Sequence, residues 1–112
     1  MKKPKLNRRL QLLVPYRTRD DAGGHVTNWQ VEGVLWAEIA ARSGNDAEVG
    51  ELNVSKANYR ITVRSAPKDA PSRPKAGQRF REGTREFDIV AVSDRDPEMR
   101  FLTCFANEEV AT

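Results

Sequence analysis

The chain has 112 residues, enough for one domain with one modest hydrophobic core and too few for a second. It contains 19 Lys and Arg against 16 Asp and Glu, and the absence of a run of about 18 apolar residues excludes a membrane-spanning helix. The basic start at Lys2, Lys3 and Lys5 lacks the apolar stretch of a signal peptide, and a single cysteine forms no internal disulfide, so we expect folding in the cytoplasm.

Apolar and polar residues mostly alternate along the chain, which is the pattern of β-strands. Pro15 has no amide donor, so the first strand either ends there or lies at a sheet edge. Trp36, in the most apolar segment, is expected to fill the core, and Cys104 is expected to be structural and half-buried. The predicted strands are 10–16, 25–31, 34–41, 59–64, 78–81, 85–92 and 99–106.

Turns separate these segments. Asp20–Gly24 supplies glycines that tolerate positive φ, and Glu82–Thr84 connects two short strands. Asp96 and Pro97 suit the first two positions of a type I turn. The sequence therefore predicts an all-β domain over 1–112, a small six- to seven-stranded β-barrel or sandwich with long loops.

Two segments do not fit the strand pattern. Residues 47–57 follow a helix-capping Asn45 or Asp46, but Gly50 and Asn53 weaken the helix, so one short helix and an extended arm are equally compatible. Residues 65–77 contain three prolines and no large apolar side chain. They predict an exposed loop rich in proline and lysine over 66–77.

Charge is distributed in blocks. Residues 1–19 hold seven basic and no acidic residues, and 20–51 hold seven acids against Arg42 alone. Residues 52–85 hold nine basic and two acidic residues, and 86–112 hold two and seven. Blocks of opposite sign are typical either of ordinary solvated charge or of a subunit whose positive face meets a neighbour's negative face or nucleic acid.

The residue inventory argues against an enzyme. His25 is the only histidine, and with Cys104 it cannot supply the three or four ligands of a zinc site. No nucleophile motif such as G-x-S-x-G accompanies it. Asp94, Asp96 and Glu98 are spaced like the start of a calcium loop, but Pro97 interrupts them and the required glycine is absent. We predict no catalytic site, no metal and no cofactor.

The proline-rich loop and its flanks carry the basic residues of most interest. In a ring of subunits these loops could converge and meet DNA phosphates without reading sequence, or the loop could be plain surface. The start of the chain, 1–8, is expected to be a flexible basic arm. The DNA-channel candidates are Arg64, Lys68, Arg73, Lys75 and Arg79.

The order of these features resembles the head–tail joining family (head-closure or stopper proteins) of tailed phages and gene transfer agents. The resemblance runs from about Leu6 to Val110, although 65–77 is longer and richer in proline and lysine than the compact turn expected there. It is carried by Arg9-Leu10, Asp20–Gly24 before Trp29, Val34–Ile39, Ser43-Gly44 with Glu48, Tyr59–Arg64, Phe80–Gly83 and Phe87–Val92.

The resemblance implies a structural subunit of a phage-like particle. It would form a ring, hexameric by analogy, between a portal or adaptor protein and a tail protein, retaining packaged double-stranded DNA and providing the tail-docking surface. The segment 45–57 is the candidate arm to a neighbouring copy, with contact candidates Asp46, Glu48, Glu51, Leu52, Val54 and Lys56. The alternative is a stand-alone nucleic-acid-binding β-barrel, against which the acidic residues near the tryptophans argue.

Overall fold

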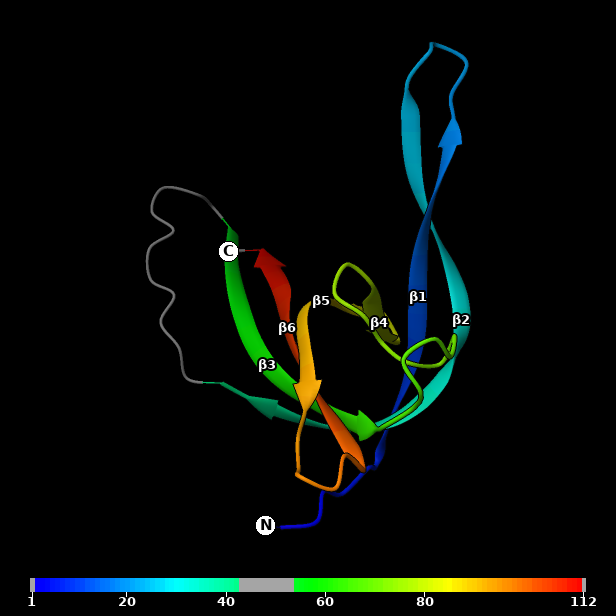
Figure 1. The fold of residues 1–112 in the computed structure, drawn as a ribbon. Helices are drawn as coiled ribbons and strands as arrows, with labels where there is room; N and C mark the ends of the chain where they lie inside the picture. The colour runs from blue at the N-terminus through cyan, green and yellow to red at the C-terminus, as the bar shows by residue number, and fades with distance from the viewer. Residues whose placement is uncertain (1, 43–53, 112) are drawn as a thin grey trace.

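A computed structural model describes residues 2–42 and 54–111, and the regular structure in these ranges is entirely β-strand. The strands pair antiparallel in the order β1-β2-β3-β6-β5-β4, and β4 pairs back to β1, so the sheet closes into a barrel (Figure 1). The predicted all-β class is therefore confirmed, with the barrel as its form. The six strands are β1 (Arg8–Arg19), β2 (His25–Ala41), β3 (Val54–Arg64), β4 (Arg79–Glu82), β5 (Arg85–Asp94) and β6 (Phe101–Ala111).

Alternate residues of each strand point into the barrel and form one core. Phe80 and Phe87 face each other across β4 and β5 at the centre, and both are fully buried. Burying side chains of this size contributes roughly 1.5–3 kcal/mol each. The other members of the buried cluster are Leu10, Leu12, Ala37, Ile61, Ile89, Val63, Leu102, Cys104 and Ala106. The interior is thus filled by side chains and is not a channel.

The two predicted strands 25–31 and 34–41 are one continuous strand, β2. Glu32 is the residue that makes this possible: Leu12 pairs with Gly33 and Leu13 with Val31, so Glu32 is an extra residue in a bulge. The bulge absorbs the break in alternation that suggested two strands.

The first strand also runs further than predicted, passing Pro15 and ending at Arg19. Beyond Leu13, β1 pairs only with β2, so one of its edges is open. Pro15 lacks an amide donor, and such a residue is tolerated in an edge strand. This part of β1 and β2 forms a two-stranded arm that extends past the barrel (Figure 1). Gly23, at φ +90°, takes the left-handed conformation in the turn at its tip.

The expectation that Trp36 fills the core is wrong. Trp36 is 54% exposed, because Leu35, Ala37 and Ile39 are the side chains of this segment that face the core. Apolar residues occur on both faces here, so alternation alone could not assign the inner one.

The segment predicted as a short helix or arm lies mostly outside the described residues, but its last part, including Val54 and Lys56, belongs to β3.

No helix in the described ranges has the length and hydropathy needed to cross a membrane.

Candidate nucleic-acid interface

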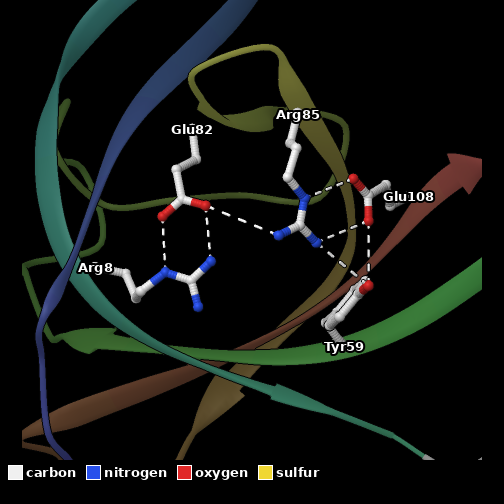
Figure 2. A network of polar contacts seen from close by, with 5 residues as sticks. All are labelled: Arg8, Tyr59, Glu82, Arg85 and Glu108. Carbon is white, nitrogen blue, oxygen red and sulfur yellow. Dashed lines mark hydrogen bonds and ion pairs between the residues drawn. The ribbon is translucent and has the colours of Figure 1, made fainter.

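One end of the barrel is closed by a layer of paired charges that point inward (Figure 2). Arg8 donates to both carboxylate oxygens of Glu82 at 2.7 Å, and Arg85 donates to both oxygens of Glu108 at 2.9 Å. The Tyr59 hydroxyl donates to Glu108 at 3.1 Å, and the Arg85 Nη1 atom lies 3.9 Å from Glu82. Two basic and two acidic side chains from β1, β4, β5 and β6 thus neutralise one another.

These contacts hold the network in its ionised form. The hydrogen bond from Arg8 lowers the pKa of Glu82 below its usual value, against the opposing effect of burial. The hydrogen bond from Arg85, with a further one from Tyr59, lowers the pKa of Glu108. Burial, followed by the Glu108 carboxylate, raises the pKa of Tyr59. The network, which we call the paired end, therefore has no unsatisfied charge to offer a ligand.

The opposite end is built around Phe101, which pairs with Arg64 at the point where β3 ends and β6 begins. The guanidinium carbons of Arg64, Arg95 and Arg100 lie 5.6, 5.9 and 5.9 Å from the centre of the Phe101 ring. Cation–π contacts of this kind contribute about 0.5–1 kcal/mol each at exposed sites. One ring thereby brings Arg64 together with two arginines of the turn between β5 and β6.

Asp96 fixes the turn that carries two of these arginines. Its buried carboxylate accepts hydrogen bonds from the Arg100 and Phe101 amides and from the Arg100 side chain, at 3.1–3.2 Å. Burial alone would raise the pKa of Asp96, but these bonds outweigh it and the pKa is lowered. The Met99 amide donates to the Asp96 carbonyl at 2.9 Å, and Met99 itself has φ +56°. The predicted turn is present, with its strain at Met99.

The proline-rich segment between β3 and β4 folds back on this end of the barrel. Pro74 is fully buried and Arg73 donates to the Ala66 carbonyl at 2.8 Å. The Ala70 amide donates to the Pro67 carbonyl at 3.0 Å, and the Gly77 amide to the Ile89 carbonyl at 2.9 Å. These bonds and the buried proline hold the loop in one place.

Two neighbouring surface hollows at this end are lined mainly by basic side chains. The first, of about 480 Å³, is lined by Arg64, Lys68, Arg73 and Arg100, with Asp94 as its one acidic side chain. The second, of about 410 Å³, shares Arg64 and Arg100 with the first and adds three further basic residues, Lys2, Lys3 and Arg95. We call this set of seven basic residues the basic end.

Most of the positive charge at the basic end is not neutralised. Arg100 pairs with Asp96 at 3.1 Å and Glu98 at 3.7 Å. Within the described ranges, Arg64, Lys68 and Arg95 form no ion pair with a carboxylate. Seven guanidinium and ammonium groups beside three carboxylates, Asp94, Asp96 and Glu98, leave a net positive charge at this end. Such groups favour an anion, and phosphate is one that they commonly bind.

The structure thus brings together three of the five predicted DNA-channel candidates, Arg64, Lys68 and Arg73. Lys75 is exposed on the same loop but lines neither hollow. Arg79 lies elsewhere, on the outside of β4, where it pairs with Asp88 at 2.7 Å and Glu86 at 3.2 Å and stacks 3.9 Å from the Trp29 ring. Sequence proximity to the loop was a poor guide for Arg79, because a strand residue is placed by its cross-strand partners.

Sequence reasoning missed four members of the basic end: Lys2, Lys3, Arg95 and Arg100. The first two belong to the predicted flexible arm, whose described part lies against the barrel, with Pro4 buried and the Lys2 carbonyl accepting from Arg95 at 2.8 Å. Arg95 and Arg100 lie in a segment that also contains Asp94, Asp96 and Glu98, so its composition suggested an acidic turn. Their positions on either side of Asp96 and Pro97 could have predicted their proximity, because a tight turn brings the residues before and after it close together.

The remaining candidate chemistry is not assembled. His25 is exposed near the arm tip. In the ranges that are described, no three His, Cys, Asp or Glu side chains come together in a metal-binding group. Cys104 was expected to be half-buried, but it is fully buried in the core, and this burial raises the pKa of its thiol to about 12.

Comparison with known proteins gives a consistent result. The family model described as phage head completion protein matches residues 1–109. A chain from the solved virion of a native gene transfer agent particle is 45% identical with a TM-score of 0.86, over 98% of this chain and all of that one. Protein SF1141 from Shigella flexneri 2a is 22% identical with a TM-score of 0.67, over 96% of each chain, which shows a shared fold. A comparison with curated proteins gave no match.

Proposed function

Because the chain belongs to the phage head completion protein family, we propose that it forms a ring at the head–tail junction of a phage-like particle. The chain is a structural component of phage or gene transfer agent particles, as the sequence resemblance predicted. The prediction that it is not an enzyme is confirmed by the same family membership.

The observation that carries the proposal is the basic end. Arg64, Lys68 and Arg95 point their charge to the surface, where nothing in the described chain neutralises it. We propose that these groups face the central channel of the ring and hold phosphates of packaged double-stranded DNA. Such contacts depend on charge and not on base sequence, so any packaged DNA satisfies them.

The filled barrel supports this placement. Phe80 and Phe87 occupy its centre, and the paired end closes one mouth. DNA cannot thread the subunit, so a DNA channel has to lie between subunits. In a ring, each copy presents its basic end once, and the charge of the ring is multiplied by its copy number.

The proposed partners are the portal or adaptor protein on the head side and a tail protein on the other. The similar chain comes from the virion of a native gene transfer agent particle, which supports assembly with other particle proteins. Retention of DNA and provision of the tail-docking surface follow from a position between those two rings.

The test uses particles that lack this chain, complemented with purified protein. We expect wild type to restore both nuclease protection of the packaged DNA and tail attachment. Arg64→Gln/Lys68→Gln should still attach tails but protect the DNA less, because two positive charges are removed from the channel. Arg60→Gln/Lys75→Gln removes the same two charge types from outside the hollows and serves as the matched control.

Two results would contradict the proposal. Heads that keep their DNA and join tails without this chain would exclude the connector role. Equal protection by Arg64→Gln/Lys68→Gln and wild type would exclude the basic end as the DNA contact.

A further inference from the structure

Two surface patches on opposite walls of the barrel have complementary character. The strand order places β3 between β2 and β6 on one side, and β4 between β1 and β5 on the other. The β1–β2 wall and the β5–β6 wall therefore face away from each other. This is the geometry that a subunit needs to contact two neighbours at once.

The first patch, which we call the tryptophan patch, lies on the outside of β1 and β2. Arg9 is opposite Trp36, and Gln11 is opposite Val34. Trp36 is 54% exposed and Val34 is 41% exposed. Arg81 of β4 extends the patch by donating to the Gln11 side chain at 2.9 Å. Glu38 follows two residues after Trp36 on the same face of β2 and accepts a hydrogen bond from the Lys5 amide at 3.1 Å. The exposed tryptophan and valine are thus bordered by two arginines and one glutamate, which makes an apolar surface with a net positive charge.

The second patch, which we call the acidic patch, lies on the outside of β5 and β6. It contains Glu86, Asp88 and Val90 of β5 and Glu109 of β6. Val90 is 53% exposed, and the Glu86 and Asp88 side chains are 45% and 48% exposed although Arg79 pairs with both. A hollow of about 260 Å³ beside them is lined by four carboxylates and one guanidinium. Lys56 lies opposite Glu109, so the three outward carboxylates Glu86, Asp88 and Glu109 face two cations, Arg79 and Lys56, and the patch around Val90 keeps a net negative charge.

We infer that the tryptophan patch of one copy binds the acidic patch of the next copy, and that this contact closes the ring. The inference rests on the proposed ring and names the surfaces that form it. Two tryptophan patches would bring arginines together, and two acidic patches would bring carboxylates together, so charge opposes a symmetric pair. A contact between unlike patches on opposite walls is head-to-tail, and it closes when the rotation per copy fits.

The arm has the features needed to enlarge this contact. Tyr16, Val26 and Val31 on it are 46%, 46% and 44% exposed. A stable interface buries about 800 Å² on each partner, more than four or five side chains supply. Since the arm continues the β1–β2 wall, we place it along the same neighbour (Figure 1).

The test uses two variants, each with one patch disabled. Arg9→Glu/Trp36→Ala keeps the acidic patch, and Val90→Ala/Glu109→Lys keeps the tryptophan patch. We expect each to weaken self-association of the purified chain by about 30-fold in sedimentation velocity, the effect of losing an interface hot spot. An equal mixture should form dimers and nothing larger, because only one competent pair of patches remains. Circular dichroism spectra and melting temperatures matching wild type establish that both variants fold.

Thiol cross-linking provides a second readout for weak association. Trp36→Cys mixed with Val90→Cys should cross-link far more than either variant alone, and Cys104 is buried and should not react. Homotypic cross-links that equal the heterotypic yield overturn the inference, as does a variant mixture that stays monomeric. These outcomes are distinct from a failure of the proposed function. Particles could join tails without the chain while purified copies still pair through these patches. Conversely, the chain could be required in particles while its copies pair through other surfaces.

Discussion

Both ends of the barrel contain arginines, but the arginines have different surroundings at the two ends. At the paired end, Arg8 and Arg85 each bind a carboxylate through two hydrogen bonds and are neutralised inside the fold. At the basic end, Arg64 and Arg95 stack on one phenylalanine ring and have no carboxylate within the described ranges. The difference separates charges that hold the barrel together from charges left for a partner.

This contrast also explains why the sequence alone was ambiguous about charge. Arginine is common at both ends, and only its cross-strand neighbours decide its role. An arginine facing inward next to a glutamate is part of the fold, whereas an outward arginine at a strand end is available for binding. Substitutions at the two ends should therefore separate stability from DNA binding.

The largest expected effect is at the paired end. Glu108→Ala should lower the free energy of unfolding by about 2 kcal/mol, because Arg85 and the Tyr59 hydroxyl lose their acceptor. The 42% exposure of the Arg85 side chain keeps the loss below that of a fully buried pair. Urea denaturation followed by circular dichroism measures it. Glu109→Ala, on the outward face of the same strand, is the control, and equal losses in the two variants would refute the role of the network.

The next effect depends on pH. Glu82 and Glu108 have pKa values lowered in the folded state, so their stabilisation is present above about pH 4.5, their ordinary pKa. It is lost as the pH falls through the lower folded values. The unfolding free energy of wild type should therefore fall more steeply in acid than that of Glu82→Gln/Glu108→Gln. Parallel curves for the two proteins below pH 4.5 would contradict the predicted linkage.

A smaller effect, of opposite sign, is expected in the turn of the basic end. Met99 has φ +56° and is 60% exposed, so Met99→Gly relieves backbone strain and loses little burial. We expect a gain of about 0.5–1 kcal/mol, measured as a rise in melting temperature. Glu98→Gly is the control at a neighbouring exposed position without positive φ, and it should not stabilise. A loss of stability in Met99→Gly would indicate that its side chain contributes packing.

The smallest stability effect is expected for the charges of the basic end. Arg64→Gln/Lys68→Gln should change the unfolding free energy by about 0.5 kcal/mol or less. The same substitutions should reduce the slope of log affinity for a DNA duplex against log salt by roughly 1.8, about 0.9 for each phosphate that the variant no longer neutralises. Arg60→Gln/Lys75→Gln should leave that slope nearly unchanged. If both pairs reduce it equally, DNA binding is diffuse and not a property of the basic end.

The sequence predicted the strands well because most of them are half-buried and alternate strictly. Tyr59–Arg64, for example, shows its inner and outer faces directly, and the structure places Ile61 and Val63 in the core. The prediction from sequence failed where strand pairing overrode the alternation of apolar and polar residues. The bulge at Glu32 joins the two predicted strands into β2. Around Trp36 both faces are apolar, so alternation did not show that Ala37 faces the core and Trp36 lies outside.

The candidate interface was predictable only in part, for a physical reason. Arg64, Lys68 and Arg73 are near one another in sequence and stay together because one ordered loop carries them. Lys2 and Arg95 are 93 positions apart and meet only because the barrel closes. Long-range contacts of this kind have no signature in a single sequence.

Closure of the barrel has a further consequence for the arm. Within the barrel nearly every strand is paired on both sides, but β2 meets β3 only from Ala37 onward, and the outer part of β1 pairs only with β2. The arm therefore carries two open strand edges, which other polypeptides can extend by backbone hydrogen bonding. Pro15, which lacks a donor, the bulge at Glu32 and the charged Arg17 and Arg19 all interrupt such pairing. The sequence thus discourages uncontrolled fibre growth from the arm.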